Sequence, residues 1–307
     1  MLKLFLPVLL APLLAGQNTI KVDVQLVNVA FSVRDASGKL VMGLNRDDFD
    51  VFEEGAPQNI SFFARGADVP LTVGLVVDFS GSQEHSGKQH HRDLLAFLKS
   101  MLGPQDRAFL LCFGNHLRLA SDLTADSAAL IDRLDRFEKG DRKFPELGPE
   151  GEIREAGTAF YDAIYYSIRE KLAGTEGGRR ALILFSDGED NSSAHHMLDA
   201  IEEAQAENVQ VFALRYTESS HGRLTARNKY GIAVMDRIAR ETGALHLDAR
   251  EGNLSRHFDE IGDALRSSYE LAYHSTNPVR DGTFRRIEIR AKAPGLTVRA
   301  KTGYFAR

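Results

Sequence analysis

The sequence is poor in cysteine and has no excess of basic residues. Cys112 is the single cysteine among 307 residues, so the chain cannot form an intramolecular disulfide. It lies in the apolar run RAFLLCF, where we expect a small core residue rather than a reactive thiol. The formal net charge of -5 provides neither the basic surface that binds nucleic acid nor the polybasic patch that binds anionic lipid. We therefore expect no nucleic-acid partner.

Long hydrophobic runs are also missing, apart from one at the start of the sequence. The stretch Leu4–Leu14 is apolar and is followed by the small residues Ala15 and Gly16. It is too short to cross a bilayer and is typical of a secretory signal peptide that ends at Ala15 or Gly16. A buried N-terminal helix is the alternative, but Pro7 and Pro12 interrupt the stretch and it has no polar face. We expect an exported protein, periplasmic or extracellular, without a membrane span.

Apolar and polar residues alternate with a period of two near both ends of the chain. The pattern covers residues 18–66 and resumes after residue 268, with turn signals between the alternating stretches. A few strands at either end bury little surface alone, so we expect them to combine. After the signal peptide at 1–16, the sequence therefore predicts one β-sandwich-like module with an N-terminal part over 17–66 and a C-terminal part over 268–307.

The middle of the chain, residues 67–267, follows a different pattern. Near-continuous apolar runs alternate with stretches of helical periodicity, and the runs read LTVGLVV, AFLLCF, ALILF, VQVFAL and ALHL. Such runs are typical of strands that are buried on both faces of a parallel sheet. We predict a doubly wound, Rossmann-like α/β domain with a mostly parallel central sheet, inserted in the β-sandwich-like module.

Oxygen-bearing side chains follow two of these apolar runs directly. Asp78 comes after LTVGLVV, with Ser80 and Ser82 in the loop beyond it, and Asp187 follows ALILF. Thr158 stands at the start of a predicted helix in the loop before ALILF. In such sheets ligands bind at the carboxyl ends of the strands, so we expect these side chains to meet there. They supply only hard oxygen donors, which suit Mg²⁺ or a similar hard cation and not zinc.

Four further residues are expected around this ion. Gly81, Gly157 and Gly188 would let the backbone turn tightly around it. Glu189 is placed at the ligand-binding rim. Glu189 and Asp190 either add negative charge near the ion or cap the helix that follows them.

The same residues resemble a known site. DFSGS matches the D-x-S-x-S signature of von Willebrand factor type A (VWA) domains, and GTAFYDAI and FSDGED match the other parts of their metal-ion-dependent adhesion site (MIDAS). The resemblance implies that Ser80, Ser82 and Thr158 bind the metal directly. It also implies that Asp78 and Asp187 act largely through bound water, and that a carboxylate of the binding partner fills the open position.

The flanks of the central domain carry a second resemblance. GLNRDDFDVFEEGAPQNISFF before it, and YELAYHS with DGTFRRIEIRAKAPGLTVRAKTGYFA after it, are similar to the VWFA-related Acidobacterial domain proteins. That resemblance covers nearly all of the mature chain and implies a bacterial, exported protein of the same architecture. It implies little about the ligand.

Other motifs lack the parts that their chemistry needs. The HRD at residues 91–93 has neither the asparagine nor the glycine-rich loop of a kinase, and the two loop serines stand in no G-x-S-x-G sequence. The polar loop 138–155 is either solvated surface or a rim over a site. Without an H-E-x-x-H motif, five histidines are expected to be exposed residues near helix starts and not zinc ligands. They are His85, His90, His91, His195 and His196.

These observations favour a secreted, non-enzymatic binding or adhesion module. It would engage an acidic side chain of a protein, or an anionic glycan, through Mg²⁺, with Mn²⁺ or Ca²⁺ as alternative ions. The alternative is a structural envelope protein whose metal site mainly stabilises the fold. A hydrolase is a third possibility, with Asp187, Glu189 or His85 as general base, but nothing in the sequence singles one out. The oligomeric state stays open.

Overall fold

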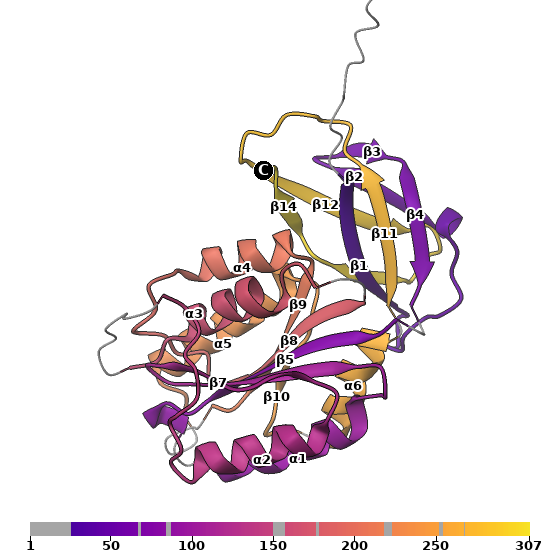
Figure 1. Cartoon of the computed structure of the whole chain (residues 1–307). Helices are drawn as coiled ribbons and strands as arrows, with labels where there is room; N and C mark the ends of the chain where they lie inside the picture. Colours follow the sequence, from indigo (N-terminus) through magenta and orange to yellow (C-terminus); the bar gives the residue numbers. More distant parts are fainter. Residues whose placement is uncertain are drawn as a thin grey trace, which may run out of the picture.

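The computed structural model describes the chain except for residues 1–25, 67–68, 84–86, 150–156, 176–177, 218–222, 252–253 and 267. The predicted signal peptide and the first part of the predicted N-terminal strand lie outside the described residues, as does His85. The described residues contain no helix that is long and apolar enough to cross a membrane. Figure 1 shows a layered α/β domain beside a smaller all-β module.

A six-stranded sheet forms the centre of the α/β domain. Its strands follow the order β10-β9-β8-β5-β6-β7, and all neighbours pair in parallel except β7, which is antiparallel to β6. The strands are β5 (Leu71–Asp78), β6 (Arg107–Phe113), β7 (Leu117–Thr124), β8 (Arg179–Ser186), β9 (Val209–Arg215) and β10 (His246–Asp248).

Helices cover both faces of this sheet (Figure 1). One face packs against α1 (Gly87–Met101), α2 (Ser127–Glu138) and α6 (Leu254–Arg266). The other packs against α3 (Phe160–Tyr166) with its π-helical continuation η3 (Ser167–Leu172), α4 (Met197–Ala206) and α5 (Ala226–Glu241). Two apolar clusters fill the two layers, which explains why β5 and β8 are apolar almost throughout. The prediction of a doubly wound domain with a mostly parallel sheet is confirmed.

Strand β7 is the element of the sheet that the apolar runs did not predict. It lies at the edge, and Arg118 and Ser121 interrupt its apolar residues. An edge strand is covered on fewer sides and needs no continuous apolar run. A short turn from β6 is enough to add it, because antiparallel neighbours need no crossover helix.

The all-β module consists of two four-stranded antiparallel sheets, and each sheet contains two strands from either end of the chain (Figure 1). One sheet has the order β13-β1-β11-β4 and the other β14-β12-β2-β3. Its strands are β1 (Leu26–Arg34), β2 (Phe49–Glu53), β3 (Ala56–Gln58), β4 (Ile60–Arg65), β11 (Tyr269–His274), β12 (Phe284–Ala291), β13 (Thr297–Ala300) and β14 (Gly303–Phe305), with a short 3-10 helix η1 (Arg46–Asp48) before β2.

The period-two alternation places one apolar cluster between the two sheets of this module. Val29 and Phe31 of β1 are fully buried there, and Ile287 and Ile289 of β12 join them. The turn between β2 and β3 falls at residues 54–55. Positive φ angles fall at Glu54 (48°) and Gly55 (80°), and pairing resumes at residue 56, as in a two-residue hairpin loop.

The two modules meet at the end of the central sheet where the parallel strands begin. Helices α4 and α5 run back from the carboxyl ends of the strands, so their last residues lie at this end. The main-chain N–H of Thr302 donates to the carbonyl of Glu241 over 3.1 Å, and Lys301 Nζ donates to the carbonyl of Gln205 over 2.9 Å. Lys301 is 6% exposed, so its ammonium group is taken out of water to make this contact.

Burial, with the charge of Arg180 acting in the same direction, lowers the pKa of Lys301 to about 7 from the ordinary 10.5. Between these two pH values the unfolded chain holds a proton that the folded chain does not. The unfolding free energy of the wild type should therefore rise with pH across this window relative to Lys301→Met, by on the order of a few kcal/mol. Urea unfolding of both proteins from pH 7 to 10 measures this difference. The exposed Lys292→Met is the control, and equal slopes in all three proteins would contradict the prediction.

Candidate metal centre

The two predicted acidic ligands lie at the carboxyl ends of neighbouring strands. Asp78 is the last residue of β5, and Asp187 directly follows β8, which pairs with β5 in parallel from Leu71 to Val77. Strand β5 also pairs with β6 on its other side. From β5 the chain adds β6 on one side of the sheet, and it later adds β8 on the other side of β5. The order in which strands join the sheet therefore reverses between β5 and β8. The predicted site thus lies at the switch point of the sheet, where α/β domains bind ligands.

Both carboxylates are buried, and only uncharged groups donate hydrogen bonds to them. Asp78 is 0% exposed and accepts from the Ser186 hydroxyl (2.6 Å) and the Ser80 main-chain N–H (2.8 Å). Asp187 is 3% exposed and accepts from Gln83 Nε2 (2.7 Å) and the main-chain N–H of Glu189 (3.0 Å). Within the described part of the chain, neither carboxylate forms an ion pair with lysine, arginine or histidine.

Burial has a direct electrostatic consequence at Asp78. Loss of water contact, with the negative charge of Asp187 added, raises the pKa of Asp78 to about 7. The hydrogen bonds from Ser186 and Ser80 oppose this shift but do not cancel it. The described part of the chain therefore places two acidic groups together without a cationic side chain that pairs with either of them.

The loop after β5 brings the predicted hydroxyl ligands to this place. Ser80 is 5% exposed, and its side chain also forms a hydrogen bond with Asp78. The loop then turns through the 3-10 helix η2 (Gly81–Gln83), which contains Ser82. The side chain of Ser82 lies outside what the structure describes. Gln83 in this helix donates hydrogen bonds to Asp187 and to the carbonyl of Tyr216, so it links the loop after β5 to the loop after β8.

Thr158 is buried beside these loops, and hydrogen bonds of its main chain hold it in place. Its N–H donates to Asn191 Oδ1 over 2.7 Å, and its carbonyl accepts from the N–H groups of Asn191 (3.0 Å) and Ser192 (3.1 Å). The next residue, Ala159, donates to the carbonyl of Gly114 over 2.7 Å. Gly114 in turn lies against the backbone of Ser80. Thr158 is therefore brought to the same end of the sheet as the two acidic residues.

The two acidic residues after Gly188 have different roles. Asp190 accepts from the N–H groups of Phe160 (2.9 Å) and Tyr161 (3.3 Å), so it caps the start of α3. The expectation that it caps the following helix is wrong, since α4 begins only at residue 197. Glu189 is 6% exposed and pairs with Arg227 of α5 over 2.5 Å. Burial, and then the charge of Asp187, raise the pKa of Glu189, while Arg227 opposes the shift.

The three glycines of the predicted site differ in whether the structure has room for a side chain at their positions. Gly188 has a φ of +77°, and a Cβ atom there would lie 2.6 Å from the carbonyl oxygen of Gly231. At Gly157 a Cβ atom would lie 2.3 Å from Asn191 Oδ1. Gly81 has open space within 4 Å of a Cβ atom, so the backbone gives no reason for glycine at this position. Close packing therefore requires glycine at two of the three positions.

Three supporting residues were not identified from the sequence. Ser186, Gln83 and Asn191 orient Asp78, Asp187 and Thr158 respectively. Ser186 and Gln83 stand next to predicted ligands, so adjacency was the one signal available. Asn191 lies 33 residues from Thr158, and only the fold brings them together.

In the polar loop 138–155, residues 145–147 pack along the edge strand β7. The N–H of Leu147 donates to the carbonyl of Leu117 over 2.9 Å, and the N–H of Leu119 donates to the carbonyl of Pro145 over 2.8 Å. Phe144 and Leu147 are buried there. The last part of the loop, from residue 150, lies outside the described residues. Cys112 is a free, buried core residue, and burial raises the pKa of its thiol.

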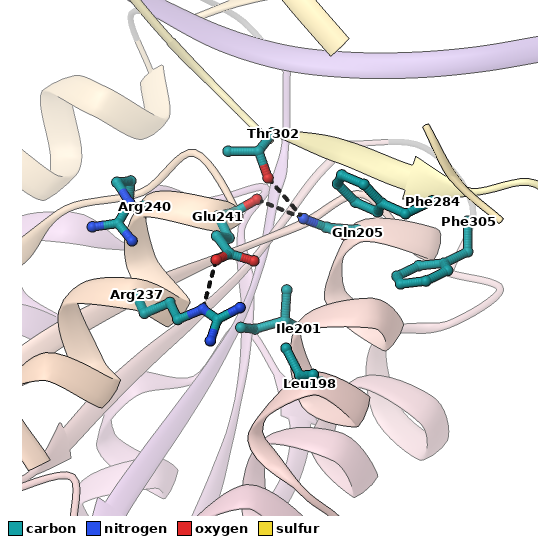
Figure 2. A pocket seen from close by; sticks show the side chains of 9 residues that line it. All are labelled: Leu198, Ile201, Gln205, Arg237, Arg240, Glu241, Phe284, Thr302 and Phe305. Atoms are coloured by element: carbon teal, nitrogen blue, oxygen red, sulfur yellow. Dashed lines mark hydrogen bonds and ion pairs between the residues drawn. The ribbon is translucent and has the colours of Figure 1, made fainter. Parts of the chain in front are cut away.

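A hollow of about 370 Å³ lies between α4, α5 and the all-β module, at the opposite end of the sheet from Asp78 (Figure 2). Several of its charged and polar groups pair with one another across its walls. Arg237 pairs with Glu241 over 2.7 Å, and Gln205 Nε2 donates to the carbonyl of Glu241 and to the Thr302 hydroxyl. Figure 2 shows these contacts joining the two helices to the strand region. We assign this hollow to the joint between the modules.

The residues at the sheet end fit a hard divalent cation. Two buried carboxylates stand beside the buried Ser80 and Thr158, and no ammonium or guanidinium group in the described part pairs with them. Mg²⁺ and similar ions prefer carboxylate, hydroxyl and water oxygens. Such an ion would neutralise the charge that burial leaves uncompensated. The roles of Asp78, Ser80, Ser82, Thr158 and Asp187 as metal ligands remain predictions.

Because the pKa of Asp78 is raised, the folded, metal-free chain holds a proton between pH 3.8 and about 7 that the unfolded chain has lost. Ionised Asp78 therefore costs stability at pH 8. Asp78→Asn should raise the unfolding free energy of the EDTA-treated protein at pH 8 by on the order of 1–3 kcal/mol. The gain should disappear below pH 4, as measured by urea unfolding. A less stable Asp78→Asn at pH 8 without metal would contradict this reading.

Comparison with known proteins finds no matching family model and no matching curated protein. Among solved structures, a von Willebrand factor type A protein from Catenulispora acidiphila is 12% identical, with a TM-score of 0.48, over 92% of this chain and 74% of that one. An aerotolerance-related membrane protein from Bacteroides fragilis is 18% identical, with a TM-score of 0.47, over 64% of this chain and 98% of that one. Proximal thread matrix protein 1 of the mussel byssus, with zinc in its MIDAS motif, is 17% identical, with a TM-score of 0.46, over 66% of this chain and 50% of that one.

Proposed function

We propose that this chain is an exported, non-enzymatic binding module that grips an acidic group of its partner through a divalent cation. The observation that carries the proposal is the pair of buried carboxylates, Asp78 and Asp187, which have no cationic partner among the described residues. A bound cation would restore charge balance at this edge of the sheet. It would also present a positive charge to a ligand beside two carboxylates that no described lysine, arginine or histidine pairs with.

The ligands we propose are the hydroxyls of Ser80, Ser82 and Thr158, with Asp78 and Asp187 acting largely through bound water. Mg²⁺ is the ion that we propose, and Mn²⁺ or Ca²⁺ are the alternatives. With five neutral or water-mediated protein contacts, the ion keeps much of its positive charge. A carboxylate from a protein partner, or from an anionic glycan, would then complete the coordination.

The surroundings of the site support binding rather than hydrolysis. A general base has to be free to accept a proton from water. Glu189 is paired with Arg227, and Asp187 already accepts hydrogen bonds from Gln83 and the N–H of Glu189. His85, the third candidate base, lies outside the described residues. We therefore propose no reaction for this chain.

The all-β module joins the opposite end of the sheet and does not cover the metal end (Figure 1). We place this protein outside the cytoplasm, in the periplasm or beyond the cell, because its apolar N-terminal stretch is typical of a signal peptide. The structural alternative rests on the same pair of carboxylates. A metal that binds only the folded chain would raise its stability by about 2.7 kcal/mol at a hundredfold excess over the dissociation constant.

Calorimetric titration of Mg²⁺ tests the metal site, and a retention assay tests the partner. Wild type and Gly81→Ala should each bind one ion, because a methyl group at position 81 meets no neighbour within 4 Å. Asp78→Ala should bind none. Envelope proteins of the source organism should be retained on immobilised wild type in Mg²⁺, released by EDTA, and not retained by Asp78→Ala.

The outcomes separate the two functions. Mg²⁺ that binds and raises the melting temperature, with no Mg²⁺-dependent retention, would support the structural role instead. Equal retention by wild type and Asp78→Ala would show that the partner does not use the metal. No Mg²⁺ binding to the wild type would remove the basis of both proposals.

A further inference from the structure

We propose that the chain has a second metal site, between α1 and α2, in which His91, Asp135 and Glu138 bind a divalent transition-metal ion such as Zn²⁺. One ligand atom from each of the three side chains lies within 4.8 Å of the other two. None of these residues belongs to the site at the ends of β5 and β8. The proposal is therefore independent of the function proposed above.

The fold brings these side chains together from two helices. His91 lies near the start of α1, while Asp135 and Glu138 lie three residues apart in the last turn of α2 and so share one face of it. His91 Nδ1 is 3.0 Å from Glu138 Oε2, and His91 Nε2 is 3.5 Å from Asp135 Oδ1. The imidazole thus lies between the two carboxylates and faces one with each nitrogen.

A metal ion would draw this arrangement closer together. Ligand atoms on a tetrahedral ion with bonds of about 2.0–2.1 Å stand about 3.3 Å apart. The three ligand atoms now lie within 4.8 Å of one another, so they have to move closer together to bind one ion. One ion binds only one imidazole nitrogen, so the carboxylate side chains have to rotate towards that nitrogen. The side chains of His91, Asp135 and Glu138 are 22%, 40% and 29% exposed, so they have room to move and the ion has access from water.

The charge of the cluster favours a cation. In the described part of the chain, His91 is the only ion-pair partner of Asp135 and of Glu138. Glu138 is also partly shielded from water, and this burial raises its pKa. With a neutral imidazole the cluster carries two negative charges, which a divalent ion would balance.

The donor types select the kind of ion. One imidazole nitrogen with two carboxylate oxygens suits Zn²⁺, Mn²⁺ or Co²⁺, whereas Mg²⁺ prefers oxygen donors alone. The first site offers only oxygens, so the two sites should differ in their choice of ion. Water would complete the coordination here, because three protein ligands leave a position open.

A metal ion bound between these two helices would link α1 to α2 close to the loop after β5. Phe137, the neighbour of Glu138, packs on Phe79 with ring centroids 4.9 Å apart. Phe79 stands between Asp78 and Ser80, and α1 begins at residue 87, a few residues after η2. A metal ion bound to His91 would therefore restrict the movement of α1, the helix that follows this loop.

Zinc titration of the full chain tests the proposal in the Asp78→Ala background, where the first site is disabled. Asp78→Ala should bind one equivalent of Zn²⁺, and the double variant Asp78→Ala/His91→Ala should bind it at least about tenfold more weakly. Added Zn²⁺ should raise the melting temperature of Asp78→Ala but not of the double variant. Circular dichroism of both proteins shows whether they are folded.

His116 provides the matched control. It pairs with a single carboxylate, Glu146, over 2.8 Å, and Arg118 shares that carboxylate. His116→Ala in the Asp78→Ala background should leave zinc binding unchanged. The proposal is overturned if folded Asp78→Ala binds no Zn²⁺, which would leave His91 as an ion-pair bridge between the helices. It is equally overturned if His91→Ala and His116→Ala weaken binding alike.

Discussion

The burial of Asp78 beside Asp187, without a compensating cation in the described chain, is the constraint on which the rest of this account depends. Taking one carboxylate out of water is unfavourable, and a second negative charge nearby makes it more so. The hydrogen bonds from Ser186, Ser80 and Gln83 orient the oxygens but bring no charge. A divalent cation is the partner that fits both the charge and the oxygen donors.

Much of the surrounding structure serves to keep this pair in place. Asp190 holds the start of α3, Asn191 holds Thr158, and Gln83 joins the loops after β5 and β8. Each of these contacts links segments that are far apart in the sequence. The described parts of the loops after β5 and β8 are therefore linked to each other and to Thr158 by hydrogen bonds in the metal-free chain, which lowers the entropic cost of binding.

The all-β module has a different task at the other end of the sheet. Its strands come from both ends of the chain, and its contacts with α4 and α5 include the buried Lys301. These contacts attach the module to the end of the sheet opposite Asp78, so the module does not cover the metal end. The paired charges of the hollow in Figure 2 agree with this assignment.

Local patterns were enough to predict the layers of the fold and the strand ends that carry the acids. The apolar runs of β5 and β8 placed Asp78 and Asp187 at one edge, because parallel buried strands leave a clear signal. The edge strand β7, the cap formed by Asp190 and the contact between Asn191 and Thr158 could not be predicted in the same way. They depend on which segments meet in space, and the pairing of His91 with Asp135 and Glu138 across two helices is of the same kind.

A crystal structure of the chain grown with Mn²⁺, examined for anomalous scattering, would locate the metal directly. We expect one strong peak among Asp78, Ser80, Ser82, Thr158 and Asp187, with an open or water-filled position facing solvent. A structure in Mn²⁺ without a peak there, in which Asp78 and Asp187 remain held only by Ser186, Ser80 and Gln83, would contradict it.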